Sequence, residues 1–180
     1  MQVFILGAQK IKGWFLSSET SVLAKKLISG QSFLDWNINT LNEIGIKNDS
    51  IFLVAGYKFK EIKDSVPNIN FIVNPKWANT HVIGSVRYAL DYWNGEDLII
   101  FYADTLFKPN FLKEFINSCS ENFIATSDFS AYNLNVKQKK TKEEILEVKN
   151  NYYKDYKKTE LTESRHFSGL TFIKKETVRK

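Results

Sequence analysis

Residues 98–104 read Leu98-Ile99-Ile100-Phe101-Tyr102-Ala103-Asp104, a run of large apolar side chains that ends in a carboxylate. An uninterrupted apolar run, as opposed to an alternating one, is typical of a strand buried on both faces of a parallel sheet. Similar runs recur along the chain, at residues 3–6, 51–55, 69–73, 123–126 and 170–173. The sequence therefore predicts a set of buried strands, most of them parallel.

Stretches with helical spacing of apolar residues separate these runs, and they predict helices over residues 33–44, 59–66, 82–93 and 109–116. Gly45 follows the first of them and Pro109 opens the last, which are the ordinary places for these residue types. Alternating strands and helices indicate an α/β fold, with a mainly parallel sheet flanked by helices on both faces. After the fifth strand the pattern weakens, and we expect a polar hairpin and loop region.

Composition and length favour an ordinary globular chain. The 180 residues suit one domain, which we expect to span residues 1–180. Cys119 is the only cysteine, so no internal disulfide can form, as in proteins of a reducing compartment. The first residues lack the features of a signal peptide, and no apolar run approaches the roughly 18 residues of a membrane span. We therefore expect a cytoplasmic protein that does not enter the membrane.

The net charge of +5 raises the question of a nucleic-acid partner. The clearest basic run, residues 136–142, is followed at once by Glu143 and Glu144. The chain has neither an arginine-rich arm nor an aromatic RNA-binding motif. A solvated hairpin or loop accounts for the basic run, and we expect no nucleic-acid partner.

Distinctive residues follow the predicted strands, where ligands of parallel sheets bind. Gly7-Ala8-Gln9 follows the first strand; its glycine either forms a simple turn or lets backbone N–H groups approach a base or phosphate. Thr80 is expected to be the N-cap of the next helix, and His81 a polar contact, part of the cap or a general base. Asp104 either holds a magnesium ion against phosphates or caps the next turn.

Residues 3–128 resemble the nucleoside-triphosphate transferases with a GT-A-like fold, a group that includes sugar-1-phosphate nucleotidyltransferases and phosphocholine cytidylyltransferases. Segment 74–85 is closer to the choline-phosphate branch than to the hexose branch. The motifs that carry the resemblance are Lys25-x-Leu27, Gly30-Gln31-Ser32-Phe33-Leu34, Thr40-Leu41, Gly45-Ile46, Val54-Ala55-Gly56-Tyr57, Asn74-Pro75-Lys76-Trp77-x-x-Thr80-His81-x-x-x-Ser85, Ala103-Asp104 and Phe167-Ser168-Gly169-Leu170-Thr171-Phe172.

The first loop departs from the family pattern Leu-Ala-Ala-Gly-x-Gly-x-Arg. Residues 6–13 have no second glycine at the family position and no arginine, and Ala24 stands where the family has a proline before Lys25. Family members usually supply a second metal-binding acid after the return strand, beyond the point where this chain stops at Lys180. Either a truncated chain or an incomplete metal site accounts for that difference.

The resemblance implies transfer of a nucleoside monophosphate, with CMP the expected group, from an NTP to a small phosphomonoester, and release of pyrophosphate. It implies a nucleotide-binding core over residues 1–128, a substrate-side region over residues 129–180, and a place in cell-surface polysaccharide biosynthesis. By family position Lys25 and Asp104 would be catalytic, with Mg²⁺ on Asp104. Lys10 or Lys12 would replace the missing arginine. The implied nucleotide-binding residues are Gly7, Ala8, Gln9, Lys10, Lys12, Gly56, Tyr57, Thr80, His81 and Ser85.

Two alternatives stay open at this point. The altered first loop is compatible with a nucleotide-binding relative that has lost catalysis. A glycosyltransferase that uses a nucleotide-sugar is the other alternative. That class typically carries an Asp-x-Asp pair, whereas Asp104-Thr105-Leu106 has no second acid.

Overall fold

A computed structural model of the chain describes residues 1–10, 23, 30–66, 68–119, 121–127, 145–149, 152–154 and 164–177. The chain divides into two compact units, one made of Met1–Phe123 with Thr171–Lys180 and the other of Ile124–Leu170. In the described part, every helix is too short or too polar to cross a membrane.

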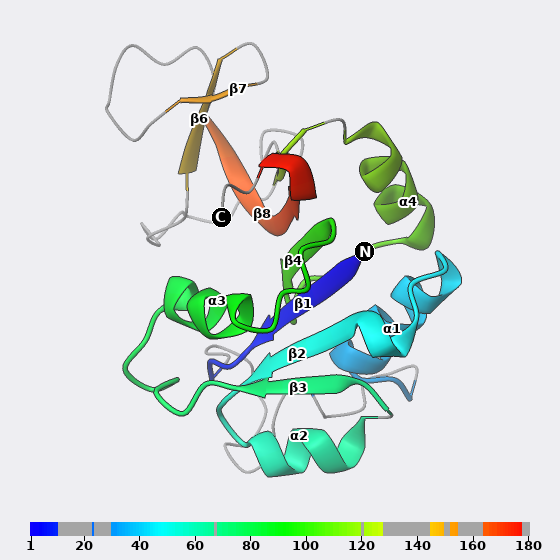
Figure 1. Cartoon of the computed structure of the whole chain (residues 1–180), viewed down its shortest axis with the longest axis vertical. Coiled ribbons are helices and arrows are strands. Elements are labelled where there is room, and N and C mark those ends of the chain that lie inside the picture. Colours follow the sequence, from blue (N-terminus) through cyan, green and yellow to red (C-terminus); the bar gives the residue numbers. More distant parts are fainter. Residues whose placement is uncertain are drawn as a thin grey trace, which may run out of the picture. The chain divides into compact units, whose positions relative to one another are not determined.

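A parallel sheet forms the centre of the first unit (Figure 1). Its strands lie in the order β3 (Asn70–Val73), β2 (Ile51–Ala55), β1 (Gln2–Gly7) and β4 (Leu98–Tyr102). All three neighbouring pairs in this order are parallel. The last residues of β8 (Ser164–Ile173), 171–173, also belong to this unit. The strands predicted from the apolar runs are thus confirmed.

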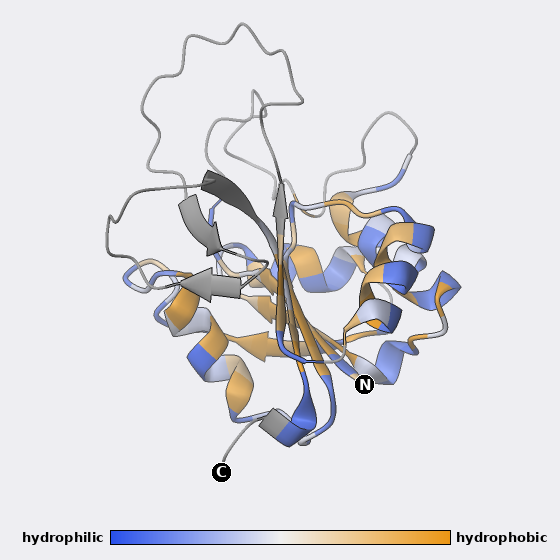
Figure 2. Cartoon of the chain, turned by 90° about the horizontal axis from the view of Figure 1, so that it is seen from above, coloured by the Kyte–Doolittle hydropathy of each residue, from blue (hydrophilic) through white to orange (hydrophobic). Residues whose placement is uncertain are grey.

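Helices lie on both sides of these apolar strands (Figure 2). Their bounds are Phe33–Glu43 for α1, Phe59–Ser65 for α2, Val82–Leu90 for α3 and Pro109–Ser118 for α4, with short 3₁₀ turns at Asn48–Ser50 and Lys175–Thr177. Strands that feed crossover helices on both faces of a parallel sheet are what the sequence predicted.

Helix α1 begins and ends on local signals. The Ser32 hydroxyl accepts from the Asp35 N–H (3.1 Å), and the Asp35 carboxylate accepts from the Ser32 N–H (2.8 Å). This reciprocal capping box satisfies two N–H groups that the first turn leaves without helical partners. At the other end, Gly45 takes a positive φ of 91°, which a glycine adopts without strain. The predicted stop at Gly45 is therefore confirmed.

One face of the sheet packs against α3. Ala89 of this helix lies in a buried cluster with Phe4, Val54 and Ile72, and Val86 packs against that cluster. Side chains alternate between the faces of a strand, so Ile5 and Leu53, which are also fully buried, point to the opposite face. Burial on both faces explains why these strands are apolar without alternation.

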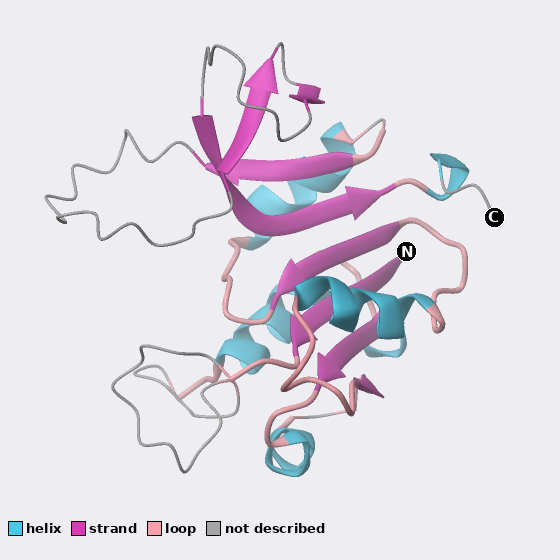
Figure 3. Ribbon diagram, turned by 90° about the vertical axis from the view of Figure 1, so that its left-hand side faces the viewer, coloured by secondary structure: helices cyan, strands magenta, loops and turns pink. Residues whose placement is uncertain are grey.

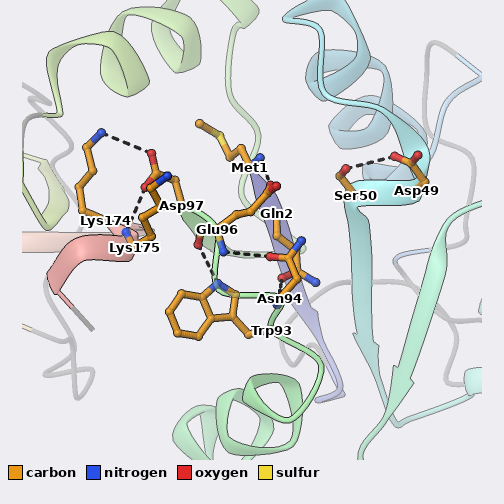
Figure 4. Close-up of polar contacts among 10 residues, drawn as sticks. All are labelled: Met1, Gln2, Asp49, Ser50, Trp93, Asn94, Glu96, Asp97, Lys174 and Lys175. Carbon is orange, nitrogen blue, oxygen red and sulfur yellow. Dashed lines mark hydrogen bonds and ion pairs between the residues drawn. The ribbon is translucent and has the colours of Figure 1, made fainter. Parts of the chain in front are cut away.

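Helix α3 ends at Leu90, before the predicted end at residue 93. The cause is a contact from the first strand. The Gln2 side chain donates to the Tyr92 carbonyl (2.9 Å) and accepts from the Asn94 N–H (3.0 Å), as Figure 4 shows for Asn94. Because the Asn94 N–H donates to Gln2, it does not continue the helix to the Leu90 carbonyl, which accepts from the Trp93 N–H instead.

The second unit is built from antiparallel strands (Figure 3). Strand β6 (Ile145–Lys149) pairs with β7 (Tyr152–Lys154) in a hairpin, and β6 also pairs with β8. Strand β5 (Phe123–Ser127) pairs with β8 as well, and the Ser168 hydroxyl donates to the Ala125 carbonyl (2.7 Å). A hairpin was expected in this region.

The cysteine lies directly after α4. Cys119 is buried, and its thiol donates to the Phe115 carbonyl at 3.0 Å. Burial raises the pKa of this thiol. The group is therefore an uncharged thiol at neutral pH.

Asp97, at the start of β4, fastens the chain that follows β8. Its carboxylate accepts from the Lys175 N–H (3.0 Å) and from the Lys174 ammonium (3.3 Å), as Figure 4 shows. Burial alone would raise the pKa of Asp97, but these hydrogen bonds and the two lysine charges outweigh it and hold the pKa below its ordinary value of 3.8. The charged form therefore stabilises the fold.

We expect Asp97→Asn to lower the free energy of unfolding at pH 7 by about 1 kcal/mol, because it removes a charge-assisted contact that is partly screened by solvent. A carboxyl with a lowered pKa contributes stability above its ordinary pKa and loses it as the pH falls through the folded value. The difference from the wild type should therefore be constant between pH 7 and pH 5 and shrink below about pH 3.8.

Urea unfolding followed by circular dichroism measures this difference. Asp64→Asn, at an exposed carboxylate of α2, is the matched control and should leave stability unchanged. A difference between Asp97→Asn and wild type that did not shrink as the pH falls from 3.8 to 2.5 would show that the charge of Asp97 is not the cause.

Candidate functional site

The carboxyl ends of the parallel strands meet at one edge of the sheet. The register pairs Val73 with Ala55, Ala55 with Gly7, and Leu6 with Tyr102. The loops that follow β1, β2, β3 and β4 therefore start at the same level. The chain leaves β1 toward β2 on one side, while β4 lies on the other, so this is also the point where the strand order reverses. Ligands of such sheets bind there.

Tight contacts join the loops after β1 and β2. The Tyr57 N–H donates to the Ala8 carbonyl at 2.9 Å. A Cβ atom on Gly56 would come within 2.4 Å of the Trp77 Cβ and 2.8 Å of the Ala8 carbonyl oxygen. Only glycine allows three segments to approach so closely. Gly56 thus has a structural role in this edge, beside the ligand contact predicted for it.

The Gln9 side chain joins the loop after β1 to the loop after β3. Its amide nitrogen donates to the Trp77 carbonyl (2.9 Å) and to the Thr80 carbonyl. A carbonyl can only accept, so the amide nitrogen has to face this loop and the amide oxygen is turned away from it. Gln9 is exposed, and no hydrogen bond to its amide oxygen comes from another described residue.

The buried side chain of Asn74 holds the loop after β3 through hydrogen bonds. It is completely buried, and its backbone N–H donates to the Ala55 carbonyl at 2.8 Å. Its amide nitrogen donates to the Thr80 hydroxyl (2.8 Å) and to the Ser85 hydroxyl (3.1 Å), and its amide oxygen accepts from the Lys76 N–H (2.9 Å). One side chain therefore holds two points of the loop and the first turns of α3.

The N-cap prediction at this loop is wrong. Helix α3 begins at Val82, as predicted, but its N-cap residue is His81, and the His81 side chain makes no capping hydrogen bond. Thr80 lies one residue before the N-cap, and its hydroxyl accepts from Asn74 and donates to the Lys76 carbonyl (3.1 Å). His81 is exposed at the ligand edge, whereas Ser85 is buried beneath the loop.

Two lysines lie near the Tyr57 ring. The Lys10 ammonium is 5.7 Å and the Lys58 ammonium 5.9 Å from its centroid, within the range of cation–π attraction. The ring also contacts Trp77 edge-on, with the centroids 5.3 Å apart. Lys58 takes a left-handed φ of 50°, which is uncommon for lysine, and pairs with Glu61 at 3.5 Å. The edge therefore combines aromatic surface with positive charge, which suits an anionic aromatic ligand.

Asp104 lies at the other side of the edge, after β4. It is exposed, and its carboxylate forms no hydrogen bond or ion pair with the described residues. The described residues contain no group of three His, Cys, Asp or Glu side chains that could hold a metal ion. One carboxylate can still hold a hard cation when a ligand supplies further oxygens.

The structure brings some of the predicted site residues together at one sheet edge. Gly7, Ala8, Gln9 and Lys10 lie at the same sheet edge as the segments around Gly56, Thr80 and Asp104. Lys12 and Lys25 lie outside the described residues. Sequence reasoning missed Asn74 and Asn37 as scaffold residues. The signal for the first was its place after a strand and before Pro75, where an asparagine commonly folds a turn.

We expect Asn74→Ala to lower the free energy of unfolding by about 2 kcal/mol or more, because it removes the bond to the buried Ser85 hydroxyl together with the bonds to Thr80 and Lys76. The matched control is Asn79→Ala, at an exposed asparagine of the same loop. Thermal and urea unfolding of both variants measure the effect. Equal stability of the two variants would contradict the role of Asn74.

Known structures share this architecture, although no family model matches the sequence. HddC from Yersinia pseudotuberculosis, solved with GMP-PN, aligns with a TM-score of 0.65 and 20% identity, over 97% of this chain and 77% of that one. The inositol-1-phosphate CTP transferase of T. maritima aligns with a TM-score of 0.69 and 15% identity, over 97% and 71% of the two chains.

CTP:phosphocholine cytidylyltransferase from Streptococcus pneumoniae is a further similar structure. It aligns with a TM-score of 0.60 and 16% identity, over 96% of this chain and 70% of that one. These neighbours are nucleotidyltransferases, and they are associated with different nucleotides, GMP-PN for HddC and CTP for the other two. At such identities the similarity establishes the architecture, and the chain has the nucleotidyltransferase fold.

Proposed function

We propose that the protein is a nucleotidyltransferase that moves a nucleoside monophosphate from an NTP to a small phosphomonoester. The observation that carries the proposal is Asp104, an exposed carboxylate without a described partner at the switch point of a nucleotidyltransferase fold. The aromatic and lysine side chains at the other side of the same sheet edge fit a ligand that carries both a base and phosphates.

In the proposed reaction an oxygen of the phosphomonoester attacks the α-phosphorus of the NTP. The bond from that phosphorus to the oxygen bridging to the β-phosphate breaks, and pyrophosphate leaves with the electron pair. Such a transfer needs positioning and charge neutralisation more than covalent chemistry. Lys10 carries the positive charge available in the described part of the first loop, and the family resemblance adds Lys25.

A magnesium ion would supply Lewis-acid neutralisation of the phosphate oxygens. Magnesium is commonly held by one or two carboxylates together with substrate phosphates. The single exposed carboxylate of Asp104 fits that donor set, since the triphosphate provides the other oxygens. Asp104 would therefore hold the ion, and the site would be complete only with nucleotide bound.

CTP is the nucleotide we propose, on the basis of Gln9. Both hydrogens of its amide nitrogen serve the Trp77 and Thr80 carbonyls, so its amide oxygen is left to accept from a ligand. The amino group of cytosine is such a donor, whereas uracil presents a carbonyl at the same position. A single acceptor of this kind favours the amino base without excluding the other.

We expect Asp104→Asn to lower pyrophosphate release by about 100-fold or more, because a carboxylate that neutralises the reacting phosphates is lost. The measurement is a screen of wild type and variant with four NTPs, magnesium and a panel of phosphomonoesters. Asp91→Asn removes an exposed carboxylate after α3 and is the control for net charge. Pyrophosphate release by Asp104→Asn at the wild-type rate would refute the assignment of Asp104.

The screen also separates catalysis from binding alone. A protein that binds NTP in calorimetry but releases no pyrophosphate with any phosphomonoester would be a binding relative without this activity. A protein that binds none of the four NTPs with magnesium present would refute the proposed function.

We expect Gln9→Lys to reduce the preference for CTP over UTP by up to about tenfold, the value of one hydrogen bond. Lysine keeps N–H donors for the loop carbonyls but has no acceptor. Gln9→Ala removes both functions, so it should also lower the melting temperature. Calorimetry with CTP and UTP on all three proteins decides the matter. An unchanged preference in Gln9→Lys would show that Gln9 does not read the base.

A further inference from the structure

Three side chains of α1 bond to the loop that carries Asp104. The Asn37 amide nitrogen donates to the Ala103 carbonyl (3.1 Å), directly before Asp104. The Trp36 indole (3.3 Å) and the Thr40 hydroxyl (3.4 Å) both donate to the Phe107 carbonyl, three residues after it. Both ends of segment 103–107 are therefore fastened to one helix.

Two of these side chains are polar groups in an otherwise apolar interface. The buried residues of α1 are Phe33, Leu34, Asn37, Ile38, Thr40 and Leu41. Asn37 is only 1% exposed. An asparagine inside a helix disfavours the helix, and burying its amide costs free energy unless the amide is hydrogen-bonded. Its bond to Ala103 compensates for that cost at one particular backbone position.

The peptide groups beside Asp104 are held from two directions. The Ala103 N–H donates to the Leu6 carbonyl of β1 (3.0 Å), and the Ala103 carbonyl accepts from Asn37. The Thr105 N–H donates to the Tyr102 carbonyl (3.0 Å), which closes a turn around Asp104. The Asp104 carboxylate itself has no partner among the described residues. The direction in which the Asp104 carboxylate points therefore depends on the neighbouring backbone, which Asn37 and β1 hold in place.

Helix α1 is a firm support for this purpose. Its first turn is closed by the capping box of Ser32 and Asp35, and Leu34, Ile38 and Leu41 are almost fully buried. Because α1 is held in place by its own cap and core contacts, one hydrogen bond from it can fix the position of segment 103–107. Outer residues that orient a metal ligand in this way typically change metal affinity by about 10-fold to 100-fold when they are removed.

We propose that Asn37 is a positioning residue for Asp104, which aims the carboxylate at a divalent cation bound with nucleotide. This inference rests on the proposed function. The competing interpretation is that Asn37 only satisfies a buried carbonyl and stabilises the fold. The two interpretations differ in whether loss of the Asn37 bond changes cation binding more than loss of a neighbouring bond to the same loop.

The variants are Asn37→Leu and Thr40→Val, each close in size to the residue it replaces. Both remove one side-chain donor from α1 to segment 103–107. Thr40→Val leaves the Phe107 carbonyl bonded to Trp36, and Phe107 lies beyond the turn around Asp104. Thr40→Val is therefore the matched control for a purely structural role.

The first measurement is Mn²⁺ binding by the full chain in the presence of a non-hydrolysable CTP analogue, followed by electron paramagnetic resonance. We expect the dissociation constant to rise about tenfold or more in Asn37→Leu and to stay unchanged in Thr40→Val. In turnover, the half-saturating Mg²⁺ concentration should rise with it. Equal Mn²⁺ affinity in the two variants would overturn the proposal.

The second measurement does not need a ligand. Hydrogen exchange of the Thr105 amide, which closes the turn around Asp104, should be faster in Asn37→Leu than in Thr40→Val. Wild-type protein that binds neither Mn²⁺ nor nucleotide would refute the proposed function, and the exchange data would still show whether Asn37 holds the turn. Equal exchange in both variants would refute that hold, whatever the function.

Discussion

The parallel register of β1, β2, β3 and β4 is the constraint on which the rest of the structure depends. It aligns Val73, Ala55 and Gly7 across the sheet and sets Leu6 beside Tyr102. Because side chains alternate between faces, a slip of one residue would turn the apolar side chains of a strand to the other face. Because both faces of these strands are buried and apolar, burial alone does not prevent such a slip. Contacts in the loops at the strand ends help to fix the register.

Carboxamide side chains provide those contacts. Gln9 and Asn74 use the amide nitrogen to hold the loop after β3, and Asn37 uses it to hold the segment after β4. A carboxamide suits this work because it has two donors and an acceptor but no charge, so it can be buried without a counterion. The scaffold of the site is therefore neutral. The charges of Asp104 and Lys10 remain exposed at its surface, where a ligand can reach them.

The strands and helices could be predicted because apolar runs and helical spacing are local signals. The errors came from contacts between segments far apart in the sequence. Helix α3 ends early where the Asn94 N–H donates to the Gln2 side chain, 92 residues away in the sequence. The role of Asn37 is equally invisible in the sequence, since its partner is a backbone carbonyl 66 residues further on. The candidate ligand residues, by contrast, follow from their places after strands.

The buried thiol of Cys119 gives this protein a built-in reporter of local opening. It is the only cysteine, it lies at the end of α4, and its raised pKa keeps it in the unreactive thiol form. A maleimide or an aromatic disulfide can reach it only when the end of α4 detaches. The rate at which such a reagent labels the unmodified chain therefore measures how often the end of α4 opens, and no cysteine has to be introduced.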